Sequence, residues 1–364
     1  MNTHTLLAGA PAPVLVPVRA KAWRWLALLA AVALLCWLPV LLTERSLFGM
    51  RLSNMALLNL GLTQVNLMLI AMLGALSLNY LTGCAGLISI GHAAFYAVGA
   101  MTAAVTGTQW GWPFPLVLGA AALAGAAAGV LAGLPSLRVR GLYFVLSTFA
   151  VHYIVVYLFQ EYQFRFFDVV GVPYAPATLA GWALSTPMRW YFFLLPLVAL
   201  IYIGLRNTMR TREGRAMRAM RDHELAATAA GIDVRILRLK AFAFTSAIAS
   251  VAGAVYAYYL SNVTSEAFGI QFAIQFIAMI IIGGMGSLAG SLVGAAVWLL
   301  LPSIITGFAS KAAGSSGLLR TLLVDDKAQL VQLIFGLLVI VLLIFAPEGL
   351  AGIGRRLRSR FTRP

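Results

Sequence analysis

Charged side chains are scarce in this sequence. They make up 10% of its 364 residues, whereas 61% are hydrophobic. The surface of a soluble domain needs roughly a quarter of its residues charged, so lipid must cover much of this chain. The alternating strands of about ten residues that build membrane barrels are missing as well. Because helices satisfy their own backbone hydrogen bonds in hydrocarbon, the sequence predicts an all-α fold, a polytopic transmembrane helical bundle.

The motifs of common enzymes are also missing. The dipeptide Gly-Lys does not occur, which excludes the phosphate-binding P-loop, and no G-x-S-x-G nucleophile motif is present. The four histidines are scattered, without metal-ligand spacing. Cys36 and Cys84 lie in apolar or Gly-rich segments, where small buried residues are the simplest interpretation. We therefore expect no enzyme activity, no metal and no cofactor.

Long apolar runs are what the sequence has in abundance. A helix needs about 20 apolar residues to cross a bilayer, and the runs predict about ten spans. They lie at roughly 23–42, 55–80, 87–107, 114–134, 141–160, 188–206, 240–260, 270–284, 288–307 and 329–346. We interpret the first as an uncleaved span, since no clean small-residue cleavage site of a signal peptide follows it.

Basic residues indicate the sides of the membrane. The net charge is +15, and nine Lys or Arg residues fall within 206–240. The positive-inside rule explains this charge without nucleic acid, so membrane lipid is the expected surrounding. It predicts cytoplasmic N- and C-termini and a cytoplasmic loop at 206–240. The expected organisation is a disordered cytoplasmic segment at 1–22, a transmembrane domain at 23–350 and a basic cytoplasmic tail at 351–364.

Two Gly/Ser-rich breaks interrupt the apolar runs at corresponding places, residues 82–92 and 283–290. Paired interruptions are a sequence sign of a transport site, although tight turns and close helix contacts use glycine equally. Neutral amides in the second and eighth spans, the latter Gln271 and Gln275, suit a polar path or hydrogen bonds between helices. The candidate pathway residues are Asn59, Asn66, Asn79, Gly86, Ser89, Gly91, His92, Gly283, Gly284 and Gly286.

A stripe of small residues runs along the seventh predicted span. It recurs at intervals of three and four residues, which places it on one helix face and predicts the close approach of another helix. The stripe consists of Ser246, Ser250, Gly253 and Ala257.

The loop 206–240 contains a predicted helix. Residues 215–230 have a helix-forming composition, and Gly231 is a natural stop. Two methionines on one face favour docking against a partner. Binding to lipid headgroups is the alternative, but the large aromatic or leucine face that it requires is missing. The predicted face comprises Met217, Met220, Glu224 and Ala227.

Four stretches resemble the permease subunits of ABC importers for branched-chain amino acids. Residues 226–231, Ala-Ala-Thr-Ala-Ala-Gly, match the Ala-Ala-x-x-x-Gly part of that family's Glu-Ala-Ala-x-x-x-Gly coupling helix. Leu225 occupies the acidic position, and Glu224 precedes it. The other stretches are Gly86-Leu87-Ile88-Ser89-Ile90-Gly91-His92, Gly283-Gly284-Met285-Gly286-Ser287-Leu288 and Phe345-Ala346-Pro347-Glu348-Gly349-Leu350.

The resemblance implies a multi-pass permease of the bacterial inner membrane that forms half of a pathway for branched-chain or similar amino acids. The implied partners are a second homologous permease, two cytoplasmic ATPases and a periplasmic solute-binding protein. The same machine for another small polar solute, such as urea, an amide or an aromatic acid, is one alternative, and a self-sufficient secondary transporter is another. The implied ATPase-coupling residues are Arg215, Met217, Met220, Glu224, Ala226, Ala227 and Gly231.

Overall fold

The computed structural model describes residues 46–47, 50–51, 61–139, 141–167, 171–179, 181–312, 327–346 and 348–361. The chain divides into two compact units, residues 1–52 and 53–364. In the first unit, β1 (Ser46–Leu47) pairs antiparallel with β2 (Met50–Arg51). The predicted segment 1–22, the predicted span 23–42 and the candidate pathway residue Asn59 lie outside the described residues.

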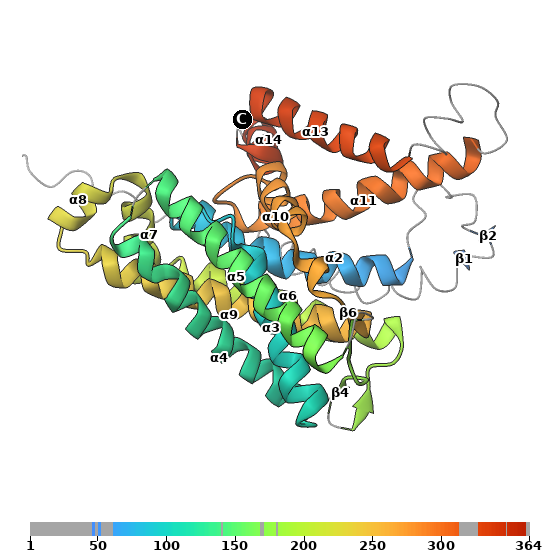
Figure 1. The fold of residues 1–364 in the computed structure, drawn as a ribbon. Coiled ribbons are helices and arrows are strands. Elements are labelled where there is room, and N and C mark those ends of the chain that lie inside the picture. The colour runs from blue at the N-terminus through green and yellow to red at the C-terminus, as the bar shows by residue number, and fades with distance from the viewer. Residues whose placement is uncertain are drawn as a thin grey trace, which may run out of the picture. The chain divides into compact units, whose positions relative to one another are not determined.

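The second unit is built mostly of helices, as the sequence predicts (Figure 1). Its first half contains α2 (Leu62–Leu78), the π-helix η2 (Asn79–Cys84), α3 (His92–Ala103), the π-helix η3 (Ala104–Gln109), α4 (Phe114–Gly133), the 3₁₀ helix η4 (Leu134–Leu137), α5 (Leu142–Phe166) and α6 (Pro187–Thr208). Its second half contains α7 (Arg212–Asp222), α8 (Glu224–Ala229), α9 (Val234–Leu260), the 3₁₀ helix η5 (Ser265–Phe268), α10 (Ile270–Gly283), α11 (Leu288–Ala312), α13 (Lys327–Phe345) and α14 (Gly349–Phe361).

Short strands occur in the connections. β3 (Val172–Pro173) pairs antiparallel with β6 (Asn262–Val263), which joins the α5–α6 connection to the segment after α9. β4 (Thr178–Leu179) pairs antiparallel with β5 (Trp182–Ala183) inside the same α5–α6 connection. The connections at this end of α9 are therefore held together by backbone hydrogen bonds.

Seven helices among the described residues are long and apolar enough to cross a membrane. They are Leu62–Cys84, Phe114–Leu137, Leu142–Phe166, Pro187–Thr208, Val234–Leu260, Ser265–Gly283 and Leu288–Ile305. The last predicted span, 329–346, forms α13, whose apolar part Val331–Val341 is shorter. The helical membrane fold is thus confirmed, whereas a total of about ten spans stays a prediction.

The third predicted span, 87–107, differs from the element that forms there. Residues 86–91 are irregular, so α3 begins at His92 and continues through η3 to Gln109. Most residues of α3 are buried, and it packs against α9, α4 and α5. A helix enclosed by other helices needs no continuous apolar surface for lipid, which explains the polar residues at both of its ends.

The stripe of small residues on α9 lies at helix contacts, as predicted. Gly125 of α4 faces Ser250, so close that an added methyl group would overlap the serine. On the neighbouring side, Gly253 lies directly against the backbone of Tyr96 in α3. Small residues let helix backbones approach and increase their van der Waals contact. The packing of α3 and α4 on α9 forms the core of the second unit.

Candidate functional site

The two Gly-rich breaks meet in space, and Asn79 at the start of η2 joins them. Its Oδ1 accepts a hydrogen bond from the Gly286 backbone N–H at 2.8 Å, and its Nδ2 donates to the Ser287 carbonyl at 2.8 Å. The Asn79 side chain is fully buried. Because both ends of a buried amide are paired, removing it would leave backbone groups unsatisfied. Gly83 leaves room for this contact, since a methyl group there would overlap Asn79 Oδ1.

Arg221, near the end of α7, reaches both breaks. Its Nη1 donates a hydrogen bond to the Gly83 carbonyl. A methyl group added at Gly286 would lie 2.7 Å from the same Nη1, and one added at Gly86 would lie 3.0 Å from Arg221 Cγ. Gly286 has φ +85°, a conformation that side-chain-bearing residues rarely adopt. One cation therefore connects α7 to both breaks, and glycines provide the space around it.

The C-terminal stretch that resembles the permease family, around Glu348 and Gly349, packs on the second break. α13 ends at Phe345 and α14 begins at Gly349. A methyl group added at Gly284 would overlap the Glu348 carbonyl, and one added at Gly349 would overlap the Gly284 backbone. The breaks, this motif and α7 are distant in sequence, and the fold brings all of them to one place.

The α6–α9 connection forms two helices where the sequence predicts one over 215–230. His223 separates α7 from α8 with an extended backbone at φ −157° and ψ 100°. Thr211 caps α7 by accepting a hydrogen bond from the Gly214 N–H at 3.4 Å. Gly231 ends the helical segment, as predicted: it adopts φ +81°, and its N–H donates to the Thr228 carbonyl at 3.0 Å.

The face predicted for docking is turned toward the bundle. Met217, Met220 and Ala227 are only 3%, 5% and 3% exposed, because the hydrophobic face of α7 and α8 packs against the rest of the chain. The structure thus corrects the prediction that the methionines form an outer contact surface. The large apolar side chain exposed on α8 is Leu225, at 69%. The exposed members of the predicted coupling set are Arg215, Ala226 and Gly231.

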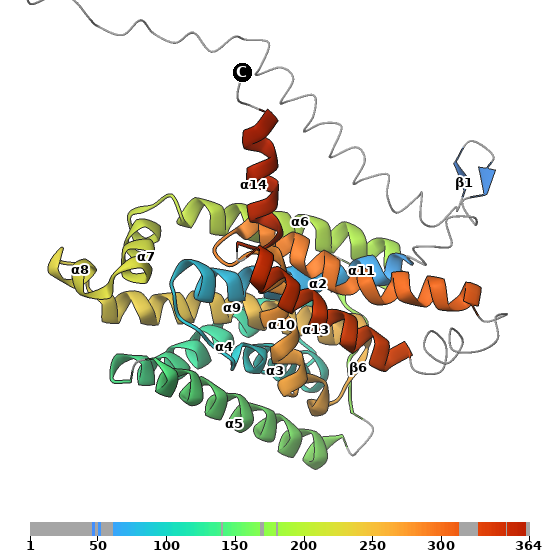
Figure 2. The same cartoon turned by 90° about the horizontal axis from the view of Figure 1, so that it is seen from above.

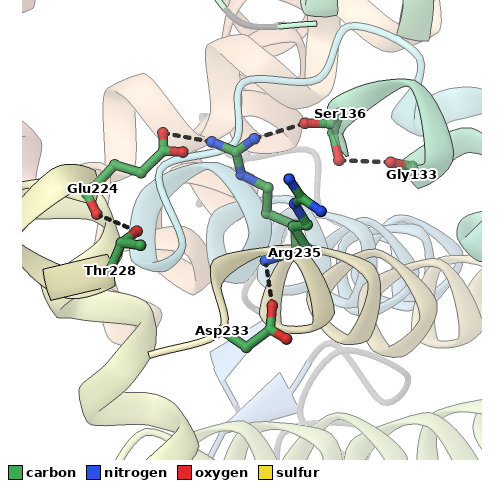
Figure 3. Close-up of polar contacts among 7 residues, drawn as sticks. Gly133, Ser136, Glu224, Thr228, Asp233 and Arg235 are labelled. Carbon is green, nitrogen blue, oxygen red and sulfur yellow. Dashed lines mark hydrogen bonds and ion pairs between the residues drawn. The ribbon is translucent and has the colours of Figure 1, made fainter. Parts of the chain in front are cut away.

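Arg238 of α9 connects α8 to the α4–α5 connection, and Figure 3 shows its two partners, Glu224 and Ser136. Its Nη2 donates to Glu224 Oε2 at 2.6 Å, and its Nη1 donates to the Ser136 carbonyl at 2.6 Å. The side chains of Arg238 and Glu224 are 11% and 28% exposed, so solvent screens this ion pair only in part. The pair also lines a cavity of about 420 Å³ that extends to Gly86 in the first break.

Comparison with known protein families shows which family the chain belongs to. Residues 60–344 match the family described as "Branched-chain amino acid transport system / permease component". The chain belongs to this permease family. The resemblance seen in the sequence motifs is confirmed, and the family is one of transport permeases rather than enzymes.

Curated relatives agree with the family match. The chain is 30% identical over 299 residues to the high-affinity branched-chain amino acid transport system permease protein LivM of Escherichia coli (strain K12), a match covering 76% of this chain and 66% of that protein. The probable LivM of Methanocaldococcus jannaschii is 25% identical over 235 residues, covering 63% of this chain and 66% of that protein. The chain therefore spans about two thirds of the length of these relatives. No solved structure matches it.

Other candidate pathway residues of this permease-family chain form contacts between helices. Asn66 of α2 is buried and donates from Nδ2 to the Pro187 carbonyl at 2.8 Å. His92 is buried, and its Nε2 shares a 2.7 Å hydrogen bond with the Ser77 hydroxyl. Ser89 is buried, and Gly91 lies directly against the Thr148 carbonyl of α5. Their role in a pathway stays a prediction.

The sequence did not predict Arg221 and Arg238 as site residues. Both belong to a loop region rich in basic residues, which the positive-inside rule explains as a group. A rule about the sum of charges does not single out the arginines that bond to backbone carbonyls inside the permease. Only the position of Arg238 could have drawn attention to it. Asp233 caps α9 by accepting a hydrogen bond from the Arg235 N–H at 3.0 Å, and Arg238 therefore lies in the first turns of that helix.

Proposed function

We propose that this chain is a permease subunit of an ATP-binding-cassette importer in the bacterial inner membrane. It forms half of the translocation pathway for branched-chain or similar amino acids. The observation that carries the proposal is the position of Arg221, which joins α7 to both Gly-rich breaks in a chain of this permease family. The names of the curated relatives, which describe branched-chain amino acid transport, support the class of solute.

In this proposal α7 and α8 lie in the cytoplasm with both termini, as the nine basic residues of 206–240 predict. The arrangement of the connections supports this orientation. The α4–α5 connection, expected inside, bonds to Arg238 beside α8. The α5–α6 and α9–α10 connections, both expected outside, pair with each other through β3 and β6.

The coupling step follows from these contacts. Two cytoplasmic ATPases would bind the exposed side of α8 and move α7 and α8 when they close on ATP. Since Arg221 contacts Gly83 and Gly286, movement of α7 would shift both breaks together. The breaks, with Gly86, Gly283 and Gly284, would then form the moving part of the pathway. A second homologous permease would supply the other half, and a periplasmic binding protein would deliver the solute.

The test is a pair of arginine variants in the complete complex, reconstituted in proteoliposomes with leucine-loaded binding protein. Arg221→Met removes the contact with the breaks. We expect leucine uptake per ATP hydrolysed to fall by about ten- to a hundredfold, the size of one lost charge-assisted hydrogen bond. Arg218→Met is the matched control, because Arg218 bonds to Met209 and Gly214 in its own connection. The control should transport normally.

Equal coupling in the Arg221→Met and Arg218→Met complexes would contradict the coupling role of Arg221. The wider proposal has separate tests. Uptake by this chain without any ATPase would indicate a self-sufficient transporter. ATP-dependent uptake of urea, an amide or an aromatic acid in place of leucine would indicate the same machine with another solute.

A further inference from the structure

A cleft of about 830 Å³ lies between α10, α11 and α13, apart from the coupling contacts. The three helices are neighbours in both views (Figures 1 and 2). Trp298 of α11 stacks on Phe335 of α13 with ring centroids 3.9 Å apart, which joins two walls of the cleft. The volume falls within the range of about 300–1,000 Å³ typical of small-molecule sites.

The cleft is apolar except for a group of glutamines. Gln271 and Gln275 are four residues apart, so they share one face of α10, and Gln332 of α13 lines the same cleft. Within the part of the chain that the structure describes, none of these three amides makes a hydrogen bond. Gln271 and Gln332 are exposed and Gln275 is partly exposed, so all three amides are open to whatever occupies the cleft. Because an amide without a hydrogen-bond partner costs free energy, water, a solute or another polypeptide must supply partners there.

The position of the glutamines favours a solute. α10 ends at the second break. α13 ends beside Glu348, which contacts that break. Both helices therefore run toward the place where Arg221 contacts the breaks. The three glutamines lie at the other ends of these helices, within about two turns of the first residue of α10 or α13. Between them and the coupling site the cleft is walled by apolar residues such as Ile281 and Ile340. Polar groups thus stand at the end expected to face outside.

We propose that this cleft holds the transported amino acid inside the membrane. The glutamine amides would bond to its charged α-ammonium and α-carboxylate groups, and the apolar walls would contact its side chain. An amide offers both a donor and an acceptor, so it fits a zwitterion without introducing a net charge. The assignment rests on the proposed function, and it adds the location and the contacts of the solute.

The first experiment measures whether the cleft contains water. In the complete complex, with Cys36→Ser and Cys84→Ala as background, Gln275→Cys is exposed to a charged methanethiosulfonate reagent. We expect Gln275→Cys to be labelled and leucine-loaded binding protein with ATP to slow the labelling. Leu123→Cys is the lipid control, since Leu123 is 75% exposed on the apolar span α4, and it should stay unlabelled. An unlabelled Gln275→Cys would overturn the assignment, whichever way uptake goes.

The second experiment measures the amide itself. Gln275→Leu should lower leucine uptake at subsaturating leucine by about three- to tenfold, the size of one lost hydrogen bond. Gln275→Asn should recover most of the uptake, and Leu200→Ile, an apolar exchange on α6 outside the cleft, should leave it unchanged. Normal uptake by Gln275→Leu would contradict the proposal. So would failure of Gln275→Leu to copurify with the second permease, because the cleft would then be a subunit interface.

The two proposals fail in different ways. Absence of ATP-dependent leucine uptake by the unmodified complex would contradict the proposed function. Labelling of Gln275→Cys depends on water in the cleft and is read separately. In a complex that transports leucine, an unlabelled cysteine or a fully active Gln275→Leu counts against the cleft alone.

Discussion

Arg238 donates hydrogen bonds to the Glu224 carboxylate and to the Ser136 carbonyl, each at 2.6 Å. One side chain of α9 therefore holds α8 and the α4–α5 connection in place. The guanidinium suits this role because its planar fork presents donors to two acceptors at once. In the proposed mechanism, this contact makes α8 move together with α9 and the α4–α5 connection when the ATPase acts on its exposed side.

Arg238→Met should destabilise the protein by about 2–3 kcal/mol. It removes the guanidinium that bonds to the Glu224 carboxylate and the Ser136 carbonyl in a largely buried place. The measurement is the free energy of unfolding of the purified permease in detergent. The matched control is Glu213→Gln, which breaks the Lys240–Glu213 pair at 2.6 Å, where both side chains are more than half exposed. That loss should stay below about 1 kcal/mol.

A double-mutant cycle separates the ion pair from its surroundings. Arg238→Met combined with Glu224→Leu should cost about 1–2 kcal/mol less than the sum of the single changes. Simple additivity would show that the two residues do not stabilise each other. An effect of Glu213→Gln as large as that of Arg238→Met would show that burial is not the cause.

Asn79→Leu should lower the free energy of unfolding by about 2–4 kcal/mol. The substitution leaves the Gly286 N–H and the Ser287 carbonyl without partners at the contact between the breaks. Asn66→Leu is the matched comparison, because it removes an equally buried amide that donates one bond to the Pro187 carbonyl. Its cost should be about half as large. Equal losses in the two variants, measured by detergent unfolding, would contradict the bridging role of Asn79.

Gly83→Ala and Gly119→Ala should shift stability in opposite directions. A methyl group at Gly83 overlaps Asn79 Oδ1 and the Gly286 N–H, so the breaks must move apart at a cost of about 1–3 kcal/mol. A methyl group at Gly119, within α4, meets nothing within 4 Å. Alanine is the better helix former there, by about 1 kcal/mol. Thermal unfolding of both variants measures the difference, and a neutral Gly83→Ala would refute the tight contact.

The sequence predicted elements well where one local pattern determines the structure. The small-residue stripe on α9 lies at helix contacts, and Gly231 ends the helical segment of α7 and α8 with a positive φ. The sequence-based prediction failed where contacts with other parts of the fold determine the structure. Residues 87–91 read as part of an apolar span, yet they are irregular because the first break packs against α5 and α7 there. Met217 and Met220 read as a docking face, and only the fold shows that they face inward.

The candidate site could be predicted only as separate pieces. The Gly-rich breaks and the loop 206–240 each have a recognisable composition. No local pattern indicates that Asn79 bonds to Gly286 or that Arg221 reaches Gly83. These contacts join residues that are 207 and 138 positions apart. A single sequence contains no record of such distances, so the convergence of the motifs had to come from the structure.

Leu225 should be the side chain of α8 on which ATPase binding depends most. It is 69% exposed, and the resemblance to the permease family implies an acidic residue at its position. Leu225→Arg places a cation at that position, and we expect copurification of the ATPase with the permease to fall by about tenfold or more, since loss of one buried apolar anchor costs about 1.5–3 kcal/mol. Leu225→Glu restores the acidic residue and should retain binding. Ile236→Arg is the matched control, because Ile236 is 53% exposed on α9, outside α7 and α8. If Leu225→Arg and Ile236→Arg bind the ATPase equally well, α8 is not its contact, and the coupling set would have to be sought on the exposed side of α7 around Arg215.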